Sequence, residues 1–140
     1  MTEREVEFDP ILDDGVVETV RGAADGPLFA LVEFTPTEFR IAYVSSATRA
    51  LYGVEGDDDE AMYDYFATVH EYVNLDLAEI DLFTESLFPM ADDVRYITTA
   101  LDMGKMVRVY LTDDRGVFVA MPSDAPVESV VTALRDATEA

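Results

Sequence analysis

A run of acidic residues is the first feature that could do chemistry, because residues 56–60 read GDDDE. Carboxylates bind Ca²⁺, but a calcium loop of the EF-hand type alternates its acids along the chain and adds a distal glutamate. Three adjacent aspartates do not converge on one ion in that way. The spacing is typical of a helix start, in which Asp57 is the N-cap and Glu60 closes a capping box. The two aspartates between them then lie near the positive end of the helix dipole. The sequence therefore predicts a helix start and no metal site.

His70 is the only histidine of the chain, and histidine is the usual proton carrier near neutral pH. It has no partner at the spacing of a metal site, and the chain has neither a Ser-His-Asp signature nor a G-x-S-x-G motif. The absence of cysteine excludes thiolate ligands and thiol nucleophiles. Glycine-rich nucleotide-binding motifs are also missing. We therefore expect no catalytic residue and no cofactor, and an enzyme would depend on His70 alone.

Positive charge is scarce and gathers in one region of the chain. Four of the nine basic residues, Arg95, Lys105, Arg108 and Arg115, fall in a stretch that has the pattern of three strands. The expected strands are residues 94–102, 105–112 and 117–121.

The expected turns set the register of these strands. A two-residue turn at residues 103–104 places Thr99 opposite Arg108. A turn at residues 114–115 places Arg108 opposite Met121. Because side chains alternate between the two faces of a sheet, one face then combines arginine with tyrosine, threonine and aliphatic side chains.

This mixed face is the candidate functional surface of the sequence. Its candidate interface or anion-binding residues are Arg95, Thr99, Arg108, Tyr110 and Met121. Mixed arginine, tyrosine and aliphatic character is favoured at protein interfaces, and the two arginines could also hold a small anion. A third possibility is that helices cover the face and that both arginines pair with nearby acids.

Hydrophobic periodicity and end signals predict the remaining elements. A helix is expected over residues 14–24, followed by a buried strand over 28–34. Thr35-Pro36-Thr37-Glu38 has the N-cap, N1 and N3 residues of a new helix, although residues 40–46 could be helix or strand. Further helices are expected over residues 57–73 and 76–88, the second with Asp76 as its N-cap, and after Pro126.

The resulting order is α-β-α-α-α-β-β-β-α. We therefore expect an α+β fold of two layers, with helices on an antiparallel sheet of about four strands. The 140 residues suit a single domain over residues 1–140.

Net charge restricts the partners and the cellular environment expected for the protein. Thirty acidic and nine basic residues give a formal net charge of -21, spread along the whole chain. Nucleic-acid binding is disfavoured because it needs a basic footprint, and the high apolar content argues against disorder. No apolar run is long enough to span a membrane, and we expect no membrane partner. Lys105 is the only lysine, and strong acidity with little lysine suits a cytoplasmic protein of a salt-accumulating halophile.

Two resemblances add to this interpretation. Residues 41–53, IAYVSSATRALYG, are similar to a strand-to-helix turn of PAS sensor domains. The segments DVRYITTALD and MVRVYLTDDRGVFVAM, with FTPTEF earlier in the chain, resemble a family of small acidic proteins of halophilic archaea. That resemblance implies an origin and a compartment but no activity.

Together these features favour a non-enzymatic protein-interaction or regulatory domain, a homodimer through the mixed sheet face. The alternative is a PAS-like small-ligand sensor, which requires residues 41–45 to form a strand beside an internal pocket.

Overall fold

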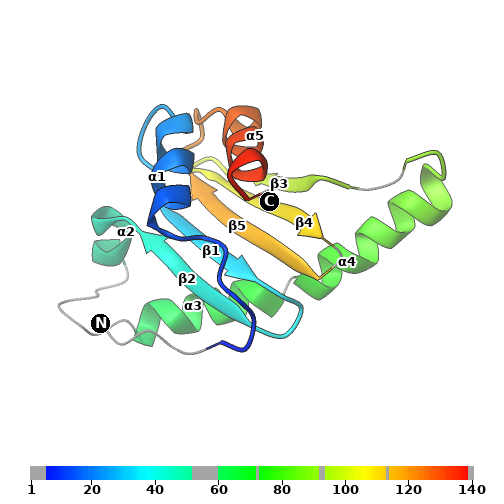
Figure 1. Cartoon of the computed structure of the whole chain (residues 1–140), viewed down its shortest axis with the longest axis horizontal. Coiled ribbons are helices and arrows are strands. Elements are labelled where there is room, and N and C mark those ends of the chain that lie inside the picture. The colour runs from blue at the N-terminus through cyan, green and yellow to red at the C-terminus, as the bar shows by residue number, and fades with distance from the viewer. Residues whose placement is uncertain (1–5, 52–59, 72, 92–93, 113, 139–140) are drawn as a thin grey trace.

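A computed structural model describes residues 6–51, 60–71, 73–91, 94–112 and 114–138. Its centre is a five-stranded antiparallel sheet with the strand order β2-β1-β5-β4-β3 (Figure 1). The strands are β1 (Ala30–Phe34), β2 (Phe39–Val44), β3 (Tyr96–Ala100), β4 (Lys105–Thr112) and β5 (Arg115–Met121). The helices are α1 (Asp14–Ala23), α2 (Ser46–Leu51), α3 (Glu60–Glu71), α4 (Val73–Asp81), the π-helix η1 (Leu82–Leu87) and α5 (Val127–Thr138). The α+β prediction is confirmed, with five strands in place of about four.

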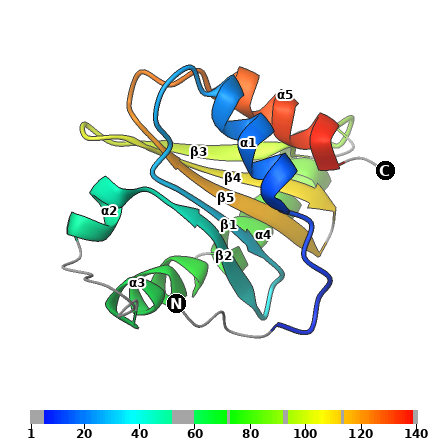
Figure 2. The same ribbon diagram turned by 60° about the vertical axis from the view of Figure 1, so that its left-hand side comes forward.

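Helices α1 and α5 lie side by side on one face of the sheet (Figure 2). Asp13 caps α1 by accepting a hydrogen bond from the amide of Val16 at 2.9 Å. Val20 and Leu134 are fully buried between these helices and the sheet. The strand residues that complete this core are Leu31, Val107, Val109, Val117, Val119 and Met121.

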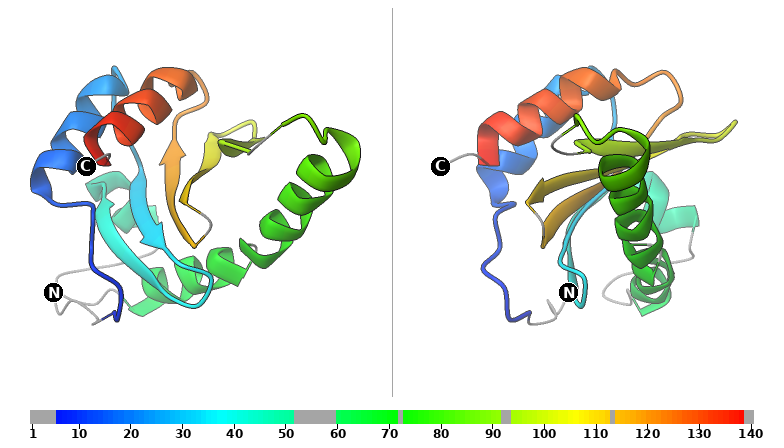
Figure 3. Two further views of the ribbon diagram at one scale, coloured as in Figure 1. Left: turned by 45° about the vertical axis from the view of Figure 1, so that its right-hand side comes forward. Right: turned by 90° about the vertical axis from the view of Figure 1, so that its right-hand side faces the viewer.

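Helices α3 and α4 run along the opposite face (Figures 1 and 3). Met62 and Phe66 of α3 are buried against Val32 and Phe118 of the sheet, as the predicted apolar seam of this helix requires. Beyond its first turns, α4 leaves the sheet and continues through η1 as a projecting segment (Figure 3). We call residues 73–91 the arm.

The helix predicted from Thr35 onward is wrong, because the residues after it form strand β2. Thr35 and Glu38 close a hairpin turn, in which the amide of Thr35 donates to the Glu38 carbonyl at 2.8 Å. The Thr35 hydroxyl accepts the Glu38 amide at 3.1 Å, as an N-cap threonine would. A threonine turn and a helix cap share this local bond, and only the residues that follow separate them. Phe34 and Phe39 consequently pair across the two strands.

The predicted register of the C-terminal strands is also wrong. In the first hairpin Arg108 lies opposite Ile97 and not Thr99, a slip of two residues that keeps each side chain on its predicted face. In the second hairpin Arg108 lies opposite Phe118 and not Met121. An irregularity between Tyr110 and Thr112 adds one residue to β4, and an odd slip reverses the faces of β5.

Two predicted helix starts have different outcomes. Residues 57–59, the proposed cap of the GDDDE motif, lie outside the described residues, and α3 is described from Glu60. The next helix begins at Val73, so Asp76 lies within α4 and is not its N-cap. The side chain of Asp76 instead bonds to residues of β4.

Candidate protein-interaction site

A buried polar cluster joins α4 to the sheet at the base of the arm. Asp76 of α4 is 5% exposed and forms a two-pronged ion pair with Arg108 of β4, with distances of 2.8 and 3.2 Å. The hydroxyl of Tyr110, two residues further along β4, donates to the same carboxylate at 2.6 Å. These bonds satisfy the carboxylate in its buried position, which is the condition under which a buried charge is tolerated.

Arg108 has little capacity left for a ligand. Its remaining terminal nitrogen donates to the Thr99 hydroxyl at 2.7 Å and to the Met106 carbonyl at 3.2 Å. Burial, followed by the hydrogen bond to Asp76, raises the pKa of Tyr110 far above its usual value. Tyr110 therefore stays protonated and keeps donating to Asp76 at neutral pH.

An apolar cavity of about 240 Å³ lies between α3, α4 and the sheet, next to this cluster. Asp76, Thr99 and Arg108 form its polar wall, and His70 also lines it. The apolar lining comes from Val32, Phe34, Phe39, Phe66, Val69, Val73, Met106 and Phe118. Because the polar groups of the wall are bonded to one another, the cavity offers mainly apolar contact.

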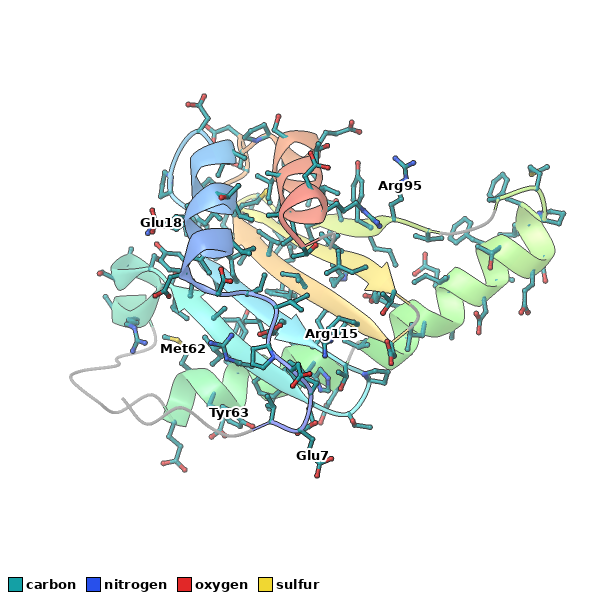
Figure 4. The ribbon with its side chains drawn as sticks, viewed as in Figure 1. Glu7, Glu18, Met62, Tyr63, Arg95 and Arg115 are labelled. Atoms are coloured by element: carbon teal, nitrogen blue, oxygen red, sulfur yellow. The ribbon has the colours of Figure 1, made fainter. Side chains whose placement is uncertain are left out.

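The structure brings together three of the five predicted site residues. Thr99, Arg108 and Tyr110 belong to the cluster, but Arg108 and Tyr110 are covered by α4 and do not form an open face. Met121 is fully buried on the other side of the sheet, under α1 and α5. Arg95 is exposed and its side chain extends away from the sheet (Figure 4). The pairing of Arg108 with an acid is therefore the alternative that the structure supports for this residue.

His70 has a structural environment. Its Nε2 lies 2.7 Å from the carbonyl oxygen of Thr35, an acceptor, so this nitrogen carries the proton. The ring also packs on Phe39, with centroids 5.4 Å apart. The bond fixes α3 to the β1–β2 turn. Among the described residues no group of acidic or histidine side chains could hold a metal ion.

Exposed apolar side chains concentrate on the arm and at the β3–β4 turn. In the described parts of the chain, every large apolar side chain that is strongly exposed falls between residues 75 and 103: Leu75, Leu82, Leu87, Phe88, Met90, Leu101 and Met103. Met90 is 80% exposed, and Phe83 stacks on Phe88 at 5.8 Å within the arm. Such clustering marks an interaction surface more often than a single exposed leucine does.

Strand β3 adds an unpaired edge to this surface. Among the described strands it pairs only with β4, and its residues Thr98, Thr99 and Ala100 are exposed. Backbone hydrogen bonds join Arg95 and Leu101 to the chain of β4 and its preceding turn. Because hydrogen-bonded residues alternate along an antiparallel strand, the backbone N–H and C=O of Thr98 point away from β4, to the free edge. Residues 96–101, YITTAL, carry no charge in a chain with 28% charged residues, and this signal was already present in the sequence. Edge strands that stay unpaired are normally protected by charge or proline.

Comparisons with known proteins identify the fold. No protein-family model matches the sequence, and no curated protein matches it significantly. A Roadblock/LC7 domain from Streptomyces avermitilis matches 86% of this chain and 89% of its own, at 14% identity and a TM-score of 0.54. A structure described as MglB with tetrameric arrangement matches 95% and 97%, at 10% identity and a TM-score of 0.57. The gliding protein MglB from Thermus thermophilus matches 95% and 98%, at 9% identity and a TM-score of 0.52.

These matches correct both resemblances read from the sequence. The chain has a fold like that of Roadblock/LC7 domains, whereas the sequence segments pointed to PAS domains and to small acidic proteins of halophilic archaea. Residues 39–44 do form a strand, as a PAS-like sensor required, but a short strand-to-helix segment is compatible with more than one fold. Among the described residues no helix is long and apolar enough to cross a membrane.

Proposed function

We propose that this protein is a non-enzymatic regulatory domain that acts by assembling with itself and with protein partners. The observation that carries the proposal is the concentration of exposed apolar side chains on the arm and at the β3–β4 turn, with the charge-free edge of β3 between them. Similarity of fold to a protein described in a tetrameric arrangement supports assembly as the mode of action.

The occupant that we propose for this surface is a second copy of the chain. An edge strand can pair in an antiparallel direction with the same strand of a second copy. The two copies are then related by a twofold axis and present the same residues to each other. The same axis would bring the apolar side chains of two arms near the shared sheet. The homodimer predicted from sequence is kept, but its surface moves from the sheet face to the sheet edge.

Electrostatics favours this edge over other surfaces of the molecule. Two copies with a net charge of -21 each repel one another over most of their surfaces. The neutral segment 96–101 and the arm segment 82–91, in which Glu85 is the only charged residue, allow close approach with the least repulsion. Burying their apolar side chains would contribute roughly 25 cal/mol for each Å² removed from water.

Light scattering after size exclusion tests the homodimer. The wild-type protein is expected to have twice the mass of one chain. Thr98→Pro removes an amide that points to the free edge while leaving the bonds to β4, so we expect a folded monomer. Leu82→Glu/Leu87→Glu places charge on the arm and has the same expected result.

The matched control is Thr132→Glu, which adds charge at an exposed position of α5. It should remain a dimer. A wild-type monomer at high protein concentration, or variants whose mass equals that of the wild type, would refute the proposed surface. Circular dichroism spectra of all variants establish that each is folded.

A further inference from the structure

A second cavity, of about 420 Å³, lies on the α1/α5 side of the sheet, away from the arm. It is formed where the N-terminal segment, the β4–β5 hairpin and the end of α5 meet. Two arginines, Arg115 and Arg135, line it together with Thr112, Thr138 and Asp114. Ile11 and Leu111 supply apolar walls. Two of the nine basic residues of the chain therefore share one cavity.

Arg135 reaches this cavity from the last turn of α5 with part of its hydrogen-bonding capacity unused. One terminal nitrogen donates to the carbonyls of Tyr110 at 2.8 Å and Arg95 at 3.2 Å. Its Nε is buried and has no hydrogen-bond partner among the described residues. A buried N–H without an acceptor costs free energy, so native structures seldom leave one unexplained.

Arg115 completes the positive wall from the start of β5. It donates to the Asp9 carbonyl at 2.8 Å, and its guanidinium lies 4.8 Å from the centre of the Phe8 ring, beside the N-terminal segment (Figure 4). No carboxylate of the described residues forms an ion pair with Arg115 or Arg135, whereas Arg21, Arg40 and Arg108 each have one. Carbonyl partners do not neutralise the positive charge of either group.

We propose that this cavity binds a small monocarboxylate with an apolar tail. The guanidinium group matches a carboxylate in shape and charge, and two such groups line this cavity. Ile11 and Leu111 would contact the tail. The carboxylate of Asp114 lies in the same wall, held by the Thr112 hydroxyl at 2.8 Å. Together with the net charge of -21, it disfavours a dianion such as phosphate relative to a singly charged ligand.

The competing explanation is purely structural, because Arg135 also ties α5 to β4 and to the segment before β3. The two explanations differ at the Nε–H. A structural clasp leaves the Nε–H signal unchanged when carboxylate is added, whereas a carboxylate bound beside the guanidinium shifts that signal.

Nuclear magnetic resonance of the arginine Nε–H groups tests the proposal on the intact protein. Sodium butyrate replaces sodium chloride at constant ionic strength, and butyramide serves as the neutral probe of the same shape. We expect the Nε–H signals of Arg135 and Arg115 to shift saturably with butyrate and to stay unchanged with butyramide. Arg115→Gln should weaken butyrate binding about tenfold, the effect of losing one charge-assisted hydrogen bond.

Arg135→Lys keeps the charge but removes the planar donor, and it should weaken butyrate binding as well. Arg21→Gln, outside the cavity, is the matched control and should bind like the wild type. Unsaturable shifts, equal shifts with butyramide, or tighter binding of inorganic phosphate would each overturn the proposal. The wild-type titration decides the matter even if a cavity variant does not fold. The homodimer can fail without affecting this result, because the cavity lies on the α1/α5 side of the sheet, away from the arm.

Discussion

At the scale of single residues, the group with the clearest physical consequence is Tyr110. Its buried hydroxyl donates to Asp76, and burial together with this bond raises its pKa. A group whose pKa is raised on folding stabilises the native state below its unfolded pKa, about 10 for tyrosine, and this stabilisation is lost as the pH rises further. The folded protein should therefore lose stability progressively above about pH 10, because the unfolded chain releases the proton first.

Tyr110→Phe tests this expectation by chemical denaturation at several pH values. At neutral pH the variant should be less stable by about 2 kcal/mol, because Asp76 loses one donor to a charged acceptor. Above about pH 10 the difference in stability between variant and wild type should narrow. Deprotonation of Tyr110 in the unfolded chain lowers the stability of the wild type, and the variant has no such group. Two stability curves that stay parallel across the alkaline range would show that Tyr110 does not titrate in this way.

The same cluster shows what the sequence could and could not predict about the site. Alternation along β4 correctly placed Arg108 and Tyr110 on one face, because it depends only on the period of a strand. Asp76 was missed as their partner because it has the local pattern of an N-cap, with a glutamate three residues later. Met121 was misplaced because one extra residue in β4 reverses the next strand, and both faces of β5 are apolar enough to allow either register.

At the scale of elements, the Thr35–Glu38 turn explains the main error in the predicted fold. The Thr35 hydroxyl accepts the amides of Thr37 and Glu38, which a helix N-terminus would also present. The residues that follow, FRIAYV, are rich in aromatic and β-branched types, and this preference for strand outweighed the cap. By contrast, α1, α5 and the three C-terminal strands were predictable because their apolar periodicity extends over the whole element.

Thr35→Ala measures the contribution of this turn. The variant loses the acceptor for two backbone amides and should destabilise the protein by about 1 kcal/mol in urea denaturation. The bond from His70 goes to the Thr35 backbone and should persist. Thr37→Ala, at the exposed tip of the same turn, is the control and should change stability much less. Equal losses for the two variants would indicate that the Thr35 hydroxyl contributes nothing specific.

At the scale of the whole molecule, charge is the dominant property. The formal net charge of -21 is distributed over the chain, and among the described residues three ion pairs have both partners placed: Arg21–Glu18, Arg40–Glu33 and Arg108–Asp76. Most of the acidic residues therefore repel one another without local compensation. This repulsion disfavours the compact state, because unfolding moves the charges apart.

Stability should therefore rise with ionic strength, whatever the source of the protein. The Debye length falls from about 30 Å at 0.01 M salt to about 3 Å at 1 M, so the free energy of unfolding should increase steeply and then level off as repulsion becomes screened. Asp64→Asn/Asp124→Asn changes two exposed acids and reduces the magnitude of the negative net charge, from -21 to -19 (-21 + 2). The double variant should be more stable than the wild type in dilute buffer and equal to it at high salt, as measured by thermal unfolding across a sodium chloride series. A gain in stability that persists unchanged at high salt would mean that these positions act locally and that long-range repulsion is not the cause.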